Sequence, residues 1–148
     1  MSLRIQKKSA RRAEVPPFPQ TLDIVVLYTS EELAAAALLR AEELAHGMKL
    51  RVRLVCAQMV PYPLPVDQPP INLQYLKSEL ERVSDRCSLE VQGEIVLARD
   101  MQTALKSALK PNSVVVLASH RRFWQTKEES LRKECIKAGH EVVLCYAR

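Results

Sequence analysis

The sequence predicts a single-domain α/β protein with three layers, α/β/α, around a five-stranded parallel sheet. Five short apolar runs alternate with four amphipathic segments, as in chains where each strand is followed by a helix. Capping residues precede the amphipathic segments, and Gly or Pro follows most of them, which is typical of helix ends. The length of 148 residues suits one domain, because domains commonly hold about 100–200 residues.

The expected strands are the five apolar runs. They cover residues 22–28, 50–60, 89–98, 114–118 and 141–148. Continuous apolar runs such as 114–118 are typical of strands that are buried on both faces of a parallel sheet. The second run begins with Arg51 and Arg53 at alternate positions, so we expect that strand to be less completely covered at its start.

The expected helices lie between these runs, over about residues 30–46, 72–87, 101–109 and 126–138. Their expected N-terminal capping residues are Thr29, Asn72, Asp100 and Thr126. Thr29 and Thr126 each stand three positions before a glutamate, which is the spacing of a capping box. Apolar residues recur at helical spacing behind each cap, so each helix has one face to bury against the sheet.

The connection after the second strand contains five prolines between residues 61 and 70. Such a segment is stiff, extended and long for a strand–helix connection. Connections of this kind serve as lids over ligands, and they also serve as plain surface spacers. Both interpretations stay open.

The net charge of +5 is concentrated at the N-terminus. Residues 1–20 hold five basic residues and one glutamate, a net charge of +4, so the expected domain at 21–148 is almost neutral. A near-neutral domain has no general basic face for nucleic acid. We expect the arm at 1–20 to be a flexible, solubilising tail. The alternatives are weak contact with a nucleic-acid backbone or an anionic membrane, and a transit peptide.

Missing patterns argue against several function classes. No apolar run approaches the roughly 18 residues of a membrane span. The four cysteines form no CxxC pair, and we expect them to be reduced core thiols of a cytoplasmic protein. The sequence has no phosphate-binding glycine loop, no GxSxG motif and no His or Cys pairs at metal spacing. We therefore expect no catalytic residue, no metal and no enzyme activity.

Ligands of parallel α/β sheets bind beyond the carboxyl ends of the strands. At these positions Thr29 follows the first expected strand. The residues that follow the fourth are Ser119, His120, Arg121 and Arg122. Two hydroxyls, an imidazole and two guanidinium groups suit a small anion, so these five residues form the candidate site.

The five-strand rhythm, the length and the run Val115–His120, VVLASH, resemble the universal stress protein family over residues 21–148. The resemblance implies an adenine nucleotide alpha hydrolase-like sheet with strand order 3-2-1-4-5. That order places a crevice between the first and fourth strands. The resemblance also implies a homodimer, often formed through the last strand.

Nucleotide-binding members of that family carry Gly-x2-Gly-x9-Gly-Ser/Thr after the fourth strand, because glycines let backbone N–H groups approach the phosphates. In this chain Ala118, Arg121 and Leu131 stand at the three glycine positions, with Ser130 replacing Leu131 after a one-residue shift. The resemblance therefore implies a member that does not bind ATP by the usual route. No cofactor is expected, and ATP or AMP is the disfavoured alternative.

Three further positions follow from the same resemblance. The acidic residue that nucleotide-binding members place after the first strand corresponds to Tyr28 or Thr29. His120 matches a position where the family often has histidine, which implies a scaffold role. Arg121 and Arg122 have two interpretations: they bind an anion in place of the lost backbone donors, or they fill the phosphate space and close the site.

These observations favour a non-enzymatic regulatory or binding module, a homodimer that works through protein contacts or a small anion. The alternative is a divergent nucleotide or anion binder that uses Ser119, Arg121 and Arg122 in place of the glycine-rich loop. A hydrolase is the third hypothesis, and it lacks a nucleophile or metal motif.

Overall fold

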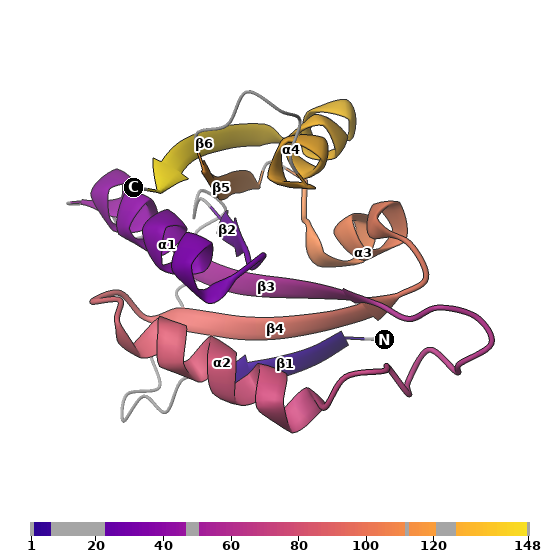
Figure 1. Cartoon of the computed structure of the whole chain (residues 1–148). Helices are drawn as coiled ribbons and strands as arrows, with labels where there is room; N and C mark the ends of the chain where they lie inside the picture. Colours follow the sequence, from indigo (N-terminus) through magenta and orange to yellow (C-terminus); the bar gives the residue numbers. More distant parts are fainter. Residues whose placement is uncertain (1, 7–22, 47–50, 112, 121–126, 148) are drawn as a thin grey trace.

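The computed structural model of the chain describes residues 2–6, 23–46, 51–111, 113–120 and 127–147 (Figure 1). The strands are β1 (Ser2–Gln6), β2 (Asp23–Leu27), β3 (Arg51–Met59), β4 (Val91–Ala98), β5 (Val114–His120) and β6 (Glu141–Ala147). The helices are α1 (Glu31–Ala45), α2 (Leu73–Asp85), α3 (Met101–Ala108) and α4 (Lys127–Lys137). From β2 onward strands and helices alternate, as the sequence predicts.

The strands form one sheet in the order β1-β4-β3-β2-β5-β6. Each neighbouring pair from β4 to β6 is parallel, and these five strands, numbered from β2, have the expected order 3-2-1-4-5. α1 and α2 pack on one face of the sheet, and α3 and α4 pack on the other (Figure 1). The predicted three-layer fold is confirmed. Its strand order changes direction between β2 and β5, so their carboxyl ends flank the ligand crevice of such sheets.

The N-terminus differs from the prediction of a flexible arm over residues 1–20. Ser2–Gln6 form β1, which pairs antiparallel with β4 from the Ser2–Val96 pair to the Gln6–Gln92 pair. Without β1, β4 would be an edge strand with unpaired backbone groups, and an extended segment of almost any composition can pair with those groups. Charge and hydropathy therefore give no signal for this strand. Residues 7–20 of the expected arm lie outside the described residues.

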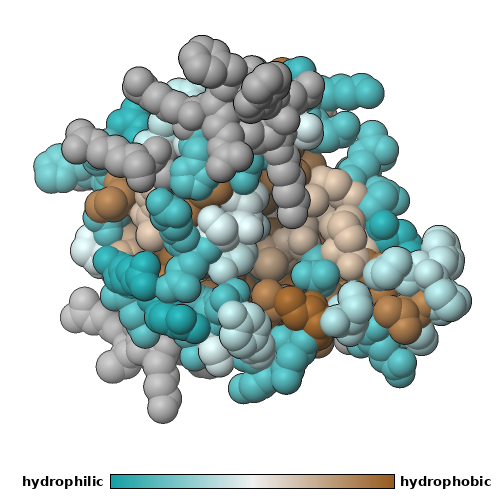
Figure 2. Space-filling view, viewed as in Figure 1, coloured by the Kyte–Doolittle hydropathy of each residue, from teal (hydrophilic) through white to brown (hydrophobic). Residues whose placement is uncertain are grey.

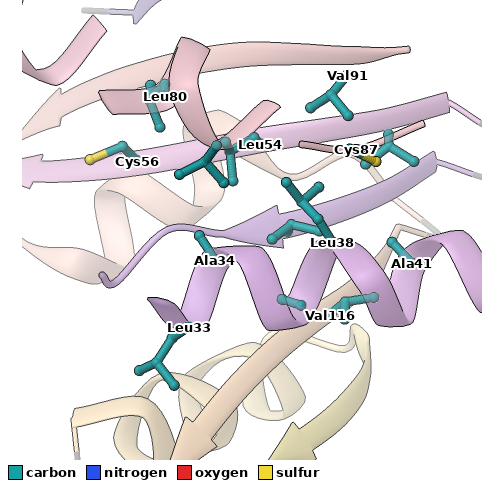
Figure 3. Packing of buried hydrophobic residues seen from close by; sticks show 14 of the residues in the cluster. Leu33, Ala34, Leu38, Ala41, Leu54, Cys56, Leu80, Cys87, Val91 and Val116 are labelled. Atoms are coloured by element: carbon teal, nitrogen blue, oxygen red, sulfur yellow. The ribbon is translucent and has the colours of Figure 1, made fainter. Parts of the chain in front are cut away.

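Alanines on its inner face let α1 lie close to the sheet. Ala34, Ala37 and Ala41 are completely buried, and short side chains allow the helix backbone to approach the strands. Figure 3 shows Ala34, Leu38 and Ala41 on the side of α1 that faces Leu54 of β3. Leu80 of α2 belongs to the same cluster, so one continuous core lies beneath both helices.

The helix caps agree with the prediction at two of the three described positions. Asn72 and Asp100 accept hydrogen bonds from the first backbone N–H groups of α2 and α3. α1 is capped by Ser30, whose Oγ accepts from the N–H of Leu33 at 3.2 Å, and not by the expected Thr29. The hydroxyl of Thr29 therefore does not cap α1, although the sequence predicts that it does.

A buried group of charges ties β2, β3 and β4 together on the face of α3 and α4. Arg53 donates from Nε and Nη2 to both carboxylate oxygens of Asp23, at 3.1 and 2.7 Å, and from Nη1 to Glu94 at 3.3 Å. Ser113 donates to Asp23 at 3.1 Å. Arg53 and Glu94 are 7% and 4% exposed. The expectation of a less covered strand start is wrong for Arg53, since carboxylates surround it, whereas Arg51 is exposed.

The surface seen in Figure 2 is mainly hydrophilic, with hydrophobic residues exposed across the middle of the view. Within the described ranges, no helix is long and apolar enough to cross a membrane.

Candidate functional site

The candidate site lies where β2 and β5 end. β2 stops at Leu27, but β5 continues to His120, and its last two residues pair with β6. The prediction from the sequence, which ends this strand at Ala118, is therefore two residues short: Ser119 and His120 belong to the strand and not to the loop that follows it. Because β5 extends past the end of β2, the last residues of β5 lie beside the crevice.

The pleat of β5 separates two of the predicted site residues. Successive side chains of a strand point to opposite faces, so Ser119 shares the face of Leu117, which packs under α3 and α4. Ser119 is 4% exposed, and its Oγ donates to the backbone carbonyl of His120 at 3.2 Å. His120 lies on the α1 face. An imidazole on the other face of the strand is not placed to activate the Ser119 hydroxyl.

His120 faces a carboxylate at the start of α1. Its Nε2 lies 3.9 Å from Oε2 of Glu32, and both side chains are at least one-third exposed. Glu31 and Glu32 occupy the first turn of α1, where the positive end of the helix dipole attracts negative charge. Glu31 lies near Arg82 of α2 and near Arg86, which follows that helix, at 3.6 and 2.7 Å, so Glu32 is the glutamate that faces His120.

Thr29 contributes an unused polar atom to the crevice. Its Oγ1 is inaccessible to solvent and has no hydrogen-bond partner among the described residues. A buried hydroxyl without a partner costs about 1–3 kcal/mol, which a bound ligand that completes the hydrogen bond recovers. Among the described members of the predicted site, Thr29 is thus the one with a buried polar atom that lacks a hydrogen-bond partner.

Tyr28 brings a carboxylate to the end of β2. Its hydroxyl donates to Oε2 of Glu79 in α2 at 2.9 Å. Burial, and then the hydrogen bond and charge of Glu79, raise the pKa of Tyr28 far above its ordinary value, so the phenol keeps its proton. The sequence places no acidic residue here, because Glu79 lies 51 positions away and belongs to a helix.

The proline-rich connection is held against the carboxyl edge of the sheet by Arg99, which follows β4. Its Nη1 donates to the backbone carbonyls of Val60 and Leu64 at 3.1 and 2.6 Å. Its guanidinium carbon lies 4.1 Å from the ring centroid of Tyr62, a cation–π geometry. These contacts fix the first turn of the segment. They leave Tyr62 80% exposed.

Two of the five predicted site residues, Arg121 and Arg122, lie outside the described residues, as does the expected cap Thr126. In the described part of the chain, no group of three or more His, Cys, Asp or Glu side chains is arranged to hold a metal ion. The described groups at the crevice are hydroxyls, one imidazole and carboxylates. They suit hydrogen bonding to a polar ligand.

The sequence matches no protein-family profile and no curated protein. Solved structures do match. A universal stress protein from Archaeoglobus fulgidus has a TM-score of 0.58 at 14% identity, over 83% of this chain and 92% of its own. A protein from the universal stress protein family of Burkholderia pseudomallei has a TM-score of 0.53 at 20% identity, over 86% and 98%.

A third structure, a universal stress protein in complex with cAMP, has a TM-score of 0.55 at 12% identity, over 86% of this chain and 98% of its own. At such identities a likeness of structures establishes the fold and nothing further. Together with the strand order and the position of the crevice, these matches identify the architecture: the chain has the fold of the universal stress proteins.

Proposed function

We propose that this chain is a non-enzymatic regulatory or binding module of the universal-stress type, which acts as a cytoplasmic homodimer and does not bind ATP in the usual way. The observation that carries the proposal is the lack of glycines in the segment that follows β5. A nucleotide needs bare backbone N–H groups around its phosphates, and this chain has no glycine between Gly93 and Gly139. The four cysteines are free, which supports a reducing compartment.

The charges at the crevice support the same proposal. The first turn of α1 attracts anions, but Glu31 and Glu32 already supply negative charge there. Glu79 adds a third carboxylate beside Tyr28. A triphosphate would have to approach these carboxylates, and like charges in a crevice repel strongly.

We expect that ATP, AMP and cAMP at 1 mM leave the thermal unfolding midpoint unchanged within about 1 °C. For a ligand with a Kd of about 10 µM, 1 mM is about 100 times the Kd. A ligand at 100 times its Kd adds about 2.7 kcal/mol of stability, which for a chain of this size is a shift of roughly 5–10 °C. Differential scanning fluorimetry checks this. cAMP is included because one protein of the same fold binds it. A clear shift with ATP would contradict the proposal.

The alternative function, an anion binder that uses Ser119, Arg121 and Arg122, is favoured by the unpaired Oγ1 of Thr29. Pyrophosphate in the same assay tests it. Under this alternative the Glu32→Gln variant, which removes a carboxylate 3.9 Å from His120, binds pyrophosphate more tightly than the wild type. Glu90→Gln is the matched control, since Glu90 is exposed at the other end of the sheet.

The open edge of the sheet supports the homodimer. β6 lies at the end of the strand order, next to β5 alone, and its sequence EVVLCYA has no lysine or proline to discourage pairing. Ile136 of α4 and Tyr146 of β6 are 49% and 52% exposed. Pairing of β6 with β6 of a second copy is a two-fold contact that uses the same edge on both chains, so it gives a closed dimer instead of a growing fibre.

The double variant Ile136→Lys/Tyr146→Lys will be monomeric at concentrations where the wild type is a dimer, with a dimer Kd raised about 100-fold or more. Central apolar contacts contribute about 2 kcal/mol or more each, and lysine on an edge opposes pairing. Sedimentation velocity measures the distribution. The control is Tyr75→Lys, which charges a 54% exposed tyrosine on α2. Wild type that stays monomeric at about 100 µM would remove the dimer from the proposal.

A further inference from the structure

A second cavity lies at the opposite end of the sheet from the crevice. It has a volume of about 590 Å³ and opens between α3 and the end of α4. Its lining includes Pro111, which precedes β5, and Gly139 and His140, which precede β6. The amino ends of β5 and β6 therefore border it, whereas the candidate site borders the carboxyl ends. Ligand cavities commonly measure about 300–1,000 Å³, so its size suits a small organic molecule.

His140 is an independent sign of a ligand at this place. His140 belongs to the lining, and its Nδ1 is a buried nitrogen without a hydrogen-bond partner among the described residues. The backbone of His140 is fixed, because its N–H donates to the carbonyl of Cys135 at 3.0 Å and Gly139 takes a φ of 91°. This is the usual glycine-dependent helix ending. The ring thus follows a rigid turn, and a small rotation of the ring would bring its unpaired nitrogen to a ligand in the cavity, with which it can form one hydrogen bond.

The charged residues of the lining favour a ligand with a negative charge. Lys106 and Lys137 lie in the last turns of α3 and α4 and both line the cavity, together with one carboxylate, Glu134. Two ammonium groups against one carboxylate leave a net charge of +1. One negative charge on the ligand is therefore favoured. The negative ends of α3 and α4 offset part of this positive charge, so the cavity does not balance a phosphate chain with several charges.

The remaining lining is apolar and shapes the other end of the ligand. Leu105 and Leu109 form part of the wall and are 4% and 8% exposed, with Pro111 and Ala138 beside them. Gln102 adds an amide. A cavity with an apolar wall, a few convergent polar groups and net positive charge suits an amphiphilic molecule.

We propose that this cavity binds an amphiphilic monoanion, an aromatic or aliphatic carboxylate, with the carboxylate at Lys106, Lys137 and His140 and the apolar body against Leu105 and Leu109. The site is separate from the crevice, and the inference does not rest on the function proposed for that crevice. It gives this fold a second ligand site, which is reached between α3 and α4 and not through the crevice at the ends of β2 and β5.

The test uses 8-anilinonaphthalene-1-sulfonate, a fluorescent aromatic monoanion, titrated into the full-length protein. We expect saturable binding that 2-naphthoate displaces and that uncharged 2-naphthamide and ATP do not. The Lys106→Gln/Lys137→Gln variant will bind the dye at least tenfold more weakly. Lys133→Gln removes an exposed lysine from the same helix outside the cavity lining, and it will bind within about twofold of the wild type.

The His140→Gln variant reports on the contact with the imidazole and is expected to weaken 2-naphthoate about fivefold. Thermal unfolding of every variant checks that the fold is retained, since both replaced lysines are exposed. Equal dye affinity in the wild type and the double lysine variant would overturn the proposal. Displacement by 2-naphthamide as effective as displacement by 2-naphthoate would also overturn it, because the site would then not recognise an anion.

Discussion

Replacing Arg53 with methionine will lower the free energy of unfolding by about 3–5 kcal/mol at pH 7, the cost of removing one partner from a buried charge group. The change leaves the carboxylates of Asp23 and Glu94 facing each other without the guanidinium that binds both. For a chain of this size the unfolding midpoint falls by roughly 10 °C. Urea denaturation followed by circular dichroism measures the loss. Arg51→Met, two residues earlier and exposed, is the control.

The stability of the wild type and of the Arg53→Met variant, measured as a function of pH, gives a second test. In the wild type, burial alone raises the pKa of Asp23, but the hydrogen bonds and charge of Arg53, with Ser113, lower it below its ordinary value of 3.8. A lowered pKa contributes stability above pH 3.8, and that stability is lost as the pH falls through the folded-state value. In Arg53→Met the carboxylate loses this partner, so acid relieves the repulsion. The difference between the two proteins will shrink below about pH 4; a constant difference would contradict the assignment.

Leu54→Ala, at the next residue of the same strand, will cost about 3–5 kcal/mol. Leu54 is completely buried in the cluster beneath α1 and α2 (Figure 3). Removing its side chain loses the transfer free energy of the missing atoms and leaves a cavity, and leucine-to-alanine changes in such cores cost about 2–5 kcal/mol. The alanine-lined face of α1 has few atoms that can move to fill the space, so the upper part of that range applies.

Leu39→Ala makes the same chemical change on the outer surface of α1, where Leu39 is 62% exposed. It is expected to change stability by less than about 0.5 kcal/mol. The two leucine variants, compared by urea denaturation with a shared m-value, compare the same side-chain truncation in the core and at the surface. A loss of similar size in both would show that Leu54 is not in the core.

Arg53 and Leu54 test the two faces of β3 separately. Arg53 lies under α3 and α4 with its carboxylates, and Leu54 lies under α1 and α2. α3 and α4 thus cover a sheet face that contains charged residues, whereas α1 and α2 cover an apolar face. The two losses should be nearly additive in a double variant, because the side chains point to opposite faces and share no partner.

The structure also separates residues that are adjacent in the sequence. Ser119 and His120 follow each other in the chain, and the prediction treats them as one site. β5 continues through both, so they face opposite helix layers, and each acquires its own neighbours: a backbone carbonyl for Ser119 and Glu32 for His120. The position of a strand end within two residues decides this, and local propensity does not define strand ends so closely.

The sequence by itself determined the five parallel strands, the four helices between them and the fold class, because hydrophobic periodicity and caps such as Asn72 and Asp100 act within one helix or strand. Only the tertiary structure decided that β1 pairs with β4, that Arg53 is buried between Asp23 and Glu94, and that Glu79 reaches Tyr28. The reason is physical: these features depend on pairing between segments far apart in the chain, and neither composition nor periodicity specifies which distant groups will meet.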